Sequence, residues 1–428
     1  MRRRGESRAP TRRPLAVSLG ALLALLGFVG PGIGAGGCVI PERTYDPSLD
    51  VDVVSQLPAG ARDAGPPDAG QGSLCETYCT TVMAPNKCRD SAAVYESPAQ
   101  CLAVCAQLPA GNLGDESGNS VSCRLSQLEK AGFEANDCAK VGPVSVDGTC
   151  GDACEAFCSL QSVACSGGEA YCESACPVLK KPAAYRLIDF ASTDTLQCRL
   201  GHLARALETP GNAAECGNAQ IMPASPSAPC RDSLEVSVED DRDYYCALVN
   251  RSCQGSDALY DTVEQCRAVS ESFERGAPDD SDNDTLRCRI YHSYLSLGAE
   301  KAMHCRHAGP TGDGRCADPD APQEGNCVSY CRLLSQGCPN AFAELEAGAP
   351  SPPGGCMAEC TALADATAGA FGTIAPLYSV NADLPGGSLK CRTLHAVRAV
   401  QNPAECDAAI AAPGSACALP PDEGANLQ

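Results

Sequence analysis

Histidine is scarce in this chain, and three of its five histidines lie in a short stretch near residue 300. The segment HCRH contains His304 and His307, and His292 lies 12 residues before His304. Imidazole nitrogens are frequent ligands of Zn²⁺ and related transition metals, and three of them can hold one ion. These residues make metal handling, or haem handling, one hypothesis for function. The alternative is that they are structural.

A second pattern pairs a recurring arginine with a later histidine. Cys-Arg recurs at a corresponding position of four similar stretches, and in three of them a histidine stands three residues after the arginine, whereas the first has Gln127 there. The arginines are Arg124, Arg199, Arg289 and Arg392, and the histidines are His202, His292 and His395. Residues three apart share a helix face. Because glutamine forms hydrogen bonds readily, its presence in the first stretch favours a capping or packing role for the pattern.

The chain lacks the short motifs that commonly mark an active site. It contains no C-x-x-C, H-E-x-x-H, G-x-S-x-G or P-loop sequence. Asp280, Asp282 and Asp284 have the spacing of a calcium loop, but Thr285 and Tyr291 stand where an EF-hand needs glycine and glutamate. We therefore expect no enzyme activity, no resident cofactor, and a solvated acidic loop at the aspartates.

The elements that position these residues are defined by cysteine. The chain has 31 cysteines and no tryptophan, so its cores are small and depend on disulfide bonds formed in an oxidising compartment. Apart from Cys38, the cysteines fall into four registers. The sequence therefore predicts a mainly α fold of four tandem disulfide-rich helical repeats after a disordered tether. The repeats are residues 75–150, 151–230, 242–316 and 327–417.

Each repeat contains two C-x-x-x-C motifs or their remnants, which predict a helical hairpin. Cysteines four residues apart lie on one face of a helix. The second helix has explicit start signals, because Ser97 with Gln100 and Thr262 with Gln265 form capping boxes. Pro98 suits the first helical position.

Two cysteines are missing together from the third repeat, where Arg242 and Ser270 occupy the outermost positions of the two motifs. The double loss indicates that these positions pair, as an antiparallel hairpin requires. The predicted nested pairs are Cys75–Cys105, Cys79–Cys101, Cys154–Cys176, Cys158–Cys172, Cys246–Cys266, Cys327–Cys360 and Cys331–Cys356. The arrangement resembles the twin C-x-x-x-C hairpin of small mitochondrial import chaperones, over two helices per repeat only.

The other four cysteines of each repeat allow three pairings. Cys123 and Cys138 lie near opposite ends of a third helix and should not pair, which leaves two alternatives open. We favour pairing in chain order. The favoured pairs are Cys88–Cys123, Cys138–Cys150, Cys165–Cys198, Cys216–Cys230, Cys253–Cys288, Cys305–Cys316, Cys338–Cys391 and Cys406–Cys417.

The amino-terminal residues have the features of an export signal. A basic start is followed by an apolar run at 15–29, which is shorter than a membrane-spanning helix usually requires. The sequence AGGC at 35–38 resembles the lipobox of bacterial lipoproteins, although Ala35 is small for that position. The resemblance implies that 1–37 is removed, that Cys38 carries a lipid, and that only this lipid contacts the membrane; an ordinary secretory signal is the alternative. Residues 38–74 are expected to form the tether.

The repeat as a whole, most clearly in residues 283–316, resembles a cysteine-rich repeat of exported proteins from myxobacteria-like species. That resemblance implies a bacterial envelope lipoprotein, at the outer membrane, without a known activity. The net charge of −21 argues against a nucleic-acid partner. The sequence thus predicts a non-enzymatic protein with a binding or structural role, whose partner is a protein or another envelope component.

Overall fold

The structure is a computed structural model, and the part of the chain it describes begins in the first repeat. The described residues are 69–130, 132–134, 137–181, 195–222, 230, 238–277, 279–318, 325–348, 355–363 and 377–418. All of them belong to one compact unit, Ala64–Gln428. The expected signal peptide, Cys38 and most of the tether lie outside the described residues. The tether was expected to reach residue 74, but residues 69–74 already form the first turns of the helix that carries Cys75.

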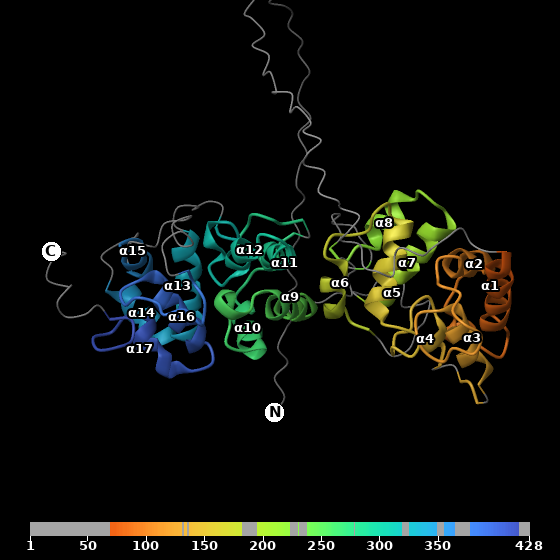
Figure 1. Cartoon of the computed structure of the whole chain (residues 1–428). Helices are drawn as coiled ribbons and strands as arrows, with labels where there is room; N and C mark the ends of the chain where they lie inside the picture. Colours follow the sequence, from red (N-terminus) through yellow and green to blue (C-terminus); the bar gives the residue numbers. More distant parts are fainter. Residues whose placement is uncertain are drawn as a thin grey trace, which may run out of the picture. The chain divides into compact units, whose positions relative to one another are not determined.

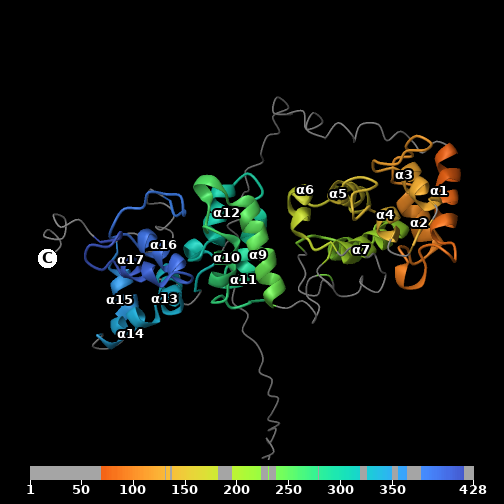
Figure 2. The same ribbon diagram turned by 90° about the horizontal axis from the view of Figure 1, so that it is seen from below.

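The described residues are helical and rich in disulfides, which confirms the predicted mainly α fold class. Within these ranges, pairing between extended segments is limited to isolated bridges, such as Lys180 with Thr195. Figure 1 shows the helices in four successive groups along the sequence, and Figure 2 shows the same groups from below. Each group corresponds to one register of cysteines.

The helix bounds follow the cysteine registers. The first repeat contains α1 (Ala69–Val82), α2 (Pro98–Cys105), α3 (Val121–Glu129) and α4 (Cys138–Val141). The second contains α5 (Ala153–Ala164), α6 (Cys172–Ala175), α7 (Leu196–Glu208) and α8 (Ala213–Asn218). The third contains α9 (Val238–Ser252), α10 (Val263–Ser270), α11 (Leu286–Leu295) and α12 (Lys301–Ala308). The fourth contains α13 (Gly325–Gly337), α14 (Pro339–Ala347), α15 (Gly355–Thr361), α16 (Leu389–Ala399) and α17 (Cys406–Ala409).

Short 3₁₀ helices lie between or beside these elements. They are η4 (Asp90–Ala92), η6 (Cys176–Val178), η8 (Gly255–Asp257), η9 (Gly312–Gly314) and η10 (Pro403–Glu405).

Side-chain caps start the helices where the sequence indicates. Ser97 accepts a hydrogen bond from the backbone N–H of Gln100 at 3.0 Å, and Thr262 accepts one from Gln265 at the same distance. The third helix of every repeat is capped by a hydroxyl that accepts from the N–H of the cysteine three residues on. These capping residues are Ser120, Thr195, Thr285 and Ser388. Each cap therefore fixes the register of a helix that carries an arginine directly after that cysteine.

Each hairpin is held by the pairs that the nested arrangement predicts. The bonds are Cys75–Cys105, Cys79–Cys101, Cys154–Cys176, Cys158–Cys172, Cys246–Cys266, Cys327–Cys360 and Cys331–Cys356. In the third repeat a guanidinium N–H of Arg242 donates to the carbonyl of Glu271 at 3.3 Å, and Ser270 is buried. A weak polar contact thus stands where the other repeats have a covalent staple.

The remaining cysteines pair differently from the expectation. The bonds are Cys88–Cys138, Cys123–Cys150, Cys165–Cys216, Cys198–Cys230, Cys253–Cys305, Cys288–Cys316, Cys338–Cys406 and Cys391–Cys417. The structure therefore contradicts Cys88–Cys123, Cys138–Cys150, Cys165–Cys198, Cys216–Cys230, Cys253–Cys288, Cys305–Cys316, Cys338–Cys391 and Cys406–Cys417.

The direction of the third helix explains this difference. At the beginning of α1, the Gln71 side chain donates to the carbonyl of Leu108, and the carbonyl of the next residue, Pro109, accepts from the N–H of Val121 at the start of α3. Beyond the end of α1, the Lys87 ammonium donates to the carbonyl of Leu128, in the last turn of α3, at 2.6 Å. The two helices therefore run in the same direction, and the cysteine that follows α1 meets the cysteine that follows α3.

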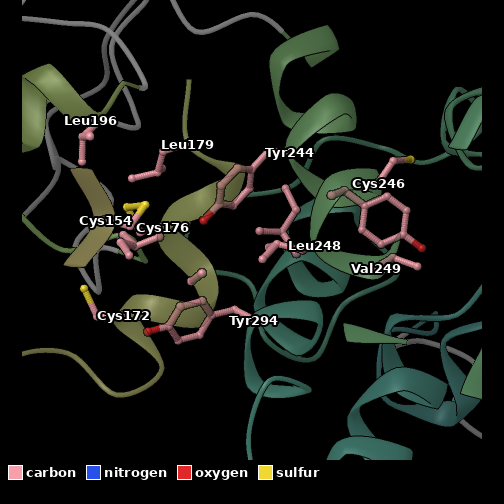
Figure 3. Packing of buried hydrophobic residues seen from close by; sticks show 14 of the residues in the cluster. Cys154, Cys172, Cys176, Leu179, Leu196, Tyr244, Cys246, Leu248, Val249 and Tyr294 are labelled. Carbon is pink, nitrogen blue, oxygen red and sulfur yellow. A yellow bond between two sulfur atoms is a disulfide. The ribbon is translucent and has the colours of Figure 1, made fainter. Parts of the chain in front are cut away.

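An aromatic residue before the second cysteine fills the centre of each repeat. Tyr78, Phe157, Tyr245 and Tyr330 are all buried. The three tyrosines donate hydrogen bonds to carbonyls in the last helix of their repeat, at Val141, Ala308 and Ala409. Figure 3 shows part of the core, with Cys154 and Cys176 joined by their disulfide and Tyr244 and Leu248 of α9 among the buried side chains.

Candidate functional site

The recurring arginine joins two backbone segments in each of the first three repeats. Arg124, Arg199 and Arg289 are fully buried. In each case one N–H of the guanidinium donates to the carbonyl of the capping residue four positions earlier, at 2.9–3.1 Å. The others donate mainly to consecutive carbonyls after the last helix, at Gly142 and Pro143, Gln220 and Ile221, and Gly309 and Pro310. A planar fork with several donors suits this bridging of two backbone segments.

The fourth repeat departs from this plan. Arg392 is only slightly exposed, and its guanidinium donates to the carboxylate of Glu359 in α15 at 2.7 Å. The arginine therefore still joins two elements of its repeat, but through an ion pair rather than through backbone carbonyls.

The recurring histidine pairs with a carboxylate in the second and fourth repeats. The Nδ1 atom of His202 lies 2.5 Å from a carboxylate oxygen of Glu215, and His395 makes the same contact with Glu405. In the first repeat the amide of Gln127 donates to the carbonyl of Glu116 at 3.0 Å. The position therefore links the third helix to another segment of its own repeat, as a packing or capping role predicts.

The third repeat places three histidines together instead. The Nδ1 atoms of His292 and His304 are 2.9 Å apart, and the rings are nearly parallel with centroids 5.2 Å apart. The His307 ring meets that of His292 edge-on, with centroids 4.7 Å apart. One nitrogen from each ring lies within 4.8 Å of the others. The structure thus brings together the three candidates that the sequence singled out.

Burial keeps these imidazoles neutral at neutral pH. Desolvation lowers the pKa of His292 to about 4, although its hydrogen bond to the carbonyl of Ser281 opposes the shift. Desolvation and the neighbouring histidines lower the pKa of His307 to about 3. Burial also lowers the pKa of His304. Neutral rings offer nitrogen lone pairs, which is the form that binds metals.

Other groups that could resemble metal sites are used structurally. His202, His292 and His395 each lie beside two cysteines, but those cysteines are joined as Cys198–Cys230, Cys288–Cys316 and Cys391–Cys417 and offer no thiolates. A ligand set of cysteine and histidine is therefore excluded at these three places.

The aspartate triplet is also used structurally. Asp284 accepts from Arg289 and Arg332, each at 2.7 Å, and Asp282 pairs with Arg315 at 2.8 Å. Asp280 accepts from the backbone of a neighbouring loop residue. These contacts agree with the absence of an EF-hand pattern in the sequence.

Sequence reasoning missed the carboxylate partners of the histidines. Glu215 and Glu405 each stand directly before a cysteine that begins or lies in the last helix, and Asp137 and His304 occupy the same register position. An acidic residue at this position in three repeats was the available signal. The third repeat is the exception, because it has His304 at this position instead of an acidic residue.

Fold and site together define a class of protein built from helical repeats with internal disulfides. In each repeat an arginine joins the third helix to another segment, through backbone carbonyls in the first three repeats and through an ion pair in the fourth. Residues 242–319 match the BfoA family C-terminal domain. This range begins at Arg242 and ends just after Cys316, so it covers the third repeat.

The curated relatives are similar over a comparable length. One is the bifonsecin B biosynthesis cluster protein A of Aspergillus brasiliensis, 32% identical over 85 residues, which are 20% of this chain and 26% of the relative. Another is the aurasperone B biosynthesis cluster protein A of Aspergillus niger, 32% identical over 74 residues, which are 17% of this chain and 24% of the relative. The chain thus spans about a quarter of the length of these relatives. No solved structure matches.

These similarities correct two expectations. The matching family and relatives are from fungal proteins, so the recognition of a bacterial lipoprotein with a myxobacterial-type repeat is wrong. The bacterial outer-membrane location is wrong for the same reason. Lipidation of Cys38 depended on that resemblance and falls outside the described residues. Among the residues that the structure describes, no helix has both the length and the apolar character needed to cross a membrane.

Proposed function

We propose that the protein is a non-enzymatic accessory protein whose stapled helical repeats serve a binding or structural role. The observation that carries this proposal is the use made of the recurring polar residues. In the first three repeats the buried arginine donates to backbone carbonyls, and in the second and fourth the histidine pairs with a glutamate of its own repeat. The residues that recur therefore build the module.

Cysteine chemistry supports the same proposal. Every cysteine in the described ranges is in a disulfide bond, so none of them is a nucleophile or a thiolate ligand. A module stapled in this way presents a stable surface with little cost of ordering on binding. Repetition of the module adds avidity when a partner offers more than one matching surface.

The partner that we propose is a protein. The chain has a net charge of −21, which disfavours nucleic acid. The relatives are named for the biosynthesis clusters of bifonsecin B and aurasperone B, so a partner that takes part in the biosynthesis of a small molecule is the natural candidate. The disulfides support an encounter in an oxidising compartment.

The proposal is tested with the full-length oxidised chain as bait in its native producer. Cross-linking followed by mass spectrometry identifies the bound protein, and titration with that purified protein measures the dissociation constant. The matched variants are His202→Gln and His395→Gln, because the first repeat carries Gln127 at this position. A structural role for these residues predicts that both variants keep the disulfide map and bind the partner as the native chain does.

An enzyme would behave differently in the same experiment. If the native chain converts a substrate in the producer's extract, and His202→Gln or His395→Gln loses that activity while folding and partner affinity are unchanged, the proposal is wrong. Failure of the full-length chain to bind any protein saturably, together with a normal disulfide map, would also overturn it.

A further inference from the structure

The histidine cluster arises from two departures of the third repeat from the pattern of the others. The register position directly before the cysteine of the last helix is Glu215 in the second repeat and His304 in the third. Two residues after that cysteine, the second repeat has Asn218 and the third has His307. A histidine–carboxylate pair has therefore become a group of three imidazoles, while the helix, the cap and the disulfides around it are kept.

The hydrogen bonds of His292 orient its free nitrogen toward His304. Its Nε2 atom lies 3.1 Å from the carbonyl oxygen of Ser281, which can only accept, so Nε2 carries the proton. In the neutral ring the lone pair is then on Nδ1, the atom 2.9 Å from Nδ1 of His304. A carbonyl that fixes the tautomer of a histidine is the usual second contact of a metal ligand.

His307 provides the third nitrogen. Its Nδ1 atom is buried and has no hydrogen-bond partner among the described residues. A buried imidazole nitrogen without a partner is costly, and an ion would satisfy it. The second repeat has no imidazole at this register position, because Asn218 stands there and is partly exposed.

We propose that His292, His304 and His307 form a binding site for one divalent transition-metal ion of the zinc type. Three neutral imidazoles with a further open position are a common Zn²⁺ ligand set. Hard cations such as Ca²⁺ and Mg²⁺ prefer oxygen ligands and should not compete. This inference goes beyond the proposed binding role. Of the two hypotheses raised by the sequence, metal handling and haem handling, it supports the binding of one metal ion.

The spacing requires only a small closure. Two nitrogens bound to a tetrahedral Zn²⁺ are roughly 3.3 Å apart, because each Zn–N bond is about 2.0–2.1 Å. One nitrogen from each of the three rings already lies within 4.8 Å of the other two. When the ion binds, the proton of His304 moves from Nδ1 to Nε2, which lies 4.0 Å from the carboxylate of Glu300. The ring stays neutral in this exchange of tautomers.

Charged groups near the site oppose one another. Arg306 and Arg315 are close enough to His307 to disfavour a second positive charge there. Glu300 faces His304, and Asp282 faces His292 while pairing with Arg315. The two acidic groups therefore offset the two arginines, so the local field does not by itself prevent a cation from binding.

The test uses the untagged full-length oxidised chain, with Zn²⁺ as the probe. Isothermal titration gives stoichiometry and affinity, and Co²⁺ in place of Zn²⁺ gives a visible spectrum that reports coordination by nitrogen. The decisive variant is His304→Glu with His307→Asn, which rewrites the third repeat to the pattern of the second. We expect one ion per native chain and at least a 100-fold weaker affinity in the double variant.

Two controls separate loss of the ligands from loss of the fold. His202→Gln in the second repeat should leave metal binding unchanged, because that histidine pairs with Glu215. The double variant should keep the Cys253–Cys305 and Cys288–Cys316 bonds in a disulfide map.

A gain-of-site variant keeps the proposal falsifiable if the third-repeat variant does not fold. Glu215→His with Asn218→His places three imidazoles in the second repeat and should add a second bound ion. The proposal is overturned if the native chain binds Zn²⁺ no more tightly than the His304→Glu, His307→Asn chain. It is equally overturned if the rewritten second repeat, correctly folded, binds no additional ion.

Discussion

The third repeat should become more stable when its missing staple is restored by Arg242→Cys together with Ser270→Cys. The inner pair of this hairpin, Cys246–Cys266, has a Cα–Cα distance of 5.8 Å, the same as Cys79–Cys101 in the first repeat. The hairpins are thus equally spaced at the inner staple, and an outer staple should form without strain in the third.

The size of the effect follows from the loop that the new bond closes. The inner bond Cys246–Cys266 already closes most of this hairpin, so the new bond closes only a further ring of about nine residues. Closing a ring of that size contributes about 2.5 kcal/mol to the free energy of unfolding in the chain-entropy treatment. The hydrogen bond from Arg242 to Glu271, 3.3 Å long, is lost and offsets about 1 kcal/mol. A net gain of about 1–2 kcal/mol remains.

Hydrogen exchange of the full-length chain measures this gain where it arises. Amides of α9 and α10 should exchange more slowly by about 5–30-fold if they open through local unfolding of the hairpin. Arg242→Cys alone, which cannot form the bond, is the matched control and should lose a little protection. In the first repeat, Cys75→Arg with Cys105→Ser should have the opposite effect on α1 and α2. If the engineered cysteines remain as free thiols, or bond without added protection, the two positions are not staple partners.

Three further predictions concern the buried polar contacts. Arg124→Met should lower the stability of the first repeat by about 3 kcal/mol or more, measured by hydrogen exchange of α3, because it leaves buried carbonyls without donors. Tyr330→Phe should cost only about 1 kcal/mol by the same measurement, since the second repeat has a phenylalanine there; a loss as large as that of Arg124→Met would contradict this reasoning. Burial raises the pKa of Asp284, but Arg289 and Arg332 outweigh burial and hold this pKa below its ordinary value of 3.8. The carboxylate therefore stabilises the fold above that pH, and its contribution is lost as the pH falls through the lowered pKa. Asp284→Asn should remove this part of the acid sensitivity in thermal melts taken from pH 5 to pH 2, and an unchanged profile would refute the assignment.

The hairpin and its nested disulfides could be predicted because local signals determine them. Cysteines four residues apart share a helix face, the capping boxes at Ser97 and Thr262 mark a helix start, and the double loss at Arg242 and Ser270 identifies partners. All three signals act within about thirty residues, where sequence spacing translates directly into geometry.

The pairing of the outer cysteines could not be obtained from spacing alone, because it depends on the direction of a helix that lies further along the chain. A third helix that reverses on the second must run parallel to the first. This places Cys88 beside Cys138 and leaves Cys123, in the first turn of the third helix, for Cys150. Pairing in chain order would have required the third helix to begin where the first one ends, whereas the contact between Lys87 and Leu128 places two carboxyl-terminal ends together.

The residues of the candidate site fall into two groups, those that recur across the repeats and those found in the third repeat alone. Residues that recur across the repeats, such as the buried arginine and the helix cap, are used to hold the module together. A position where one repeat departs while its surroundings are kept is therefore free to serve a purpose that the module does not need. The third repeat has two such departures on α12, His304 and His307, and they converge on His292. The counterparts of that histidine in the second and fourth repeats pair with a glutamate of their own repeat. Replacement of the carboxylate by His304 alone would lose a charge-assisted hydrogen bond and would add no compensating contact. The second replacement, which supplies the third nitrogen, is what makes a ligand the better explanation of the cluster.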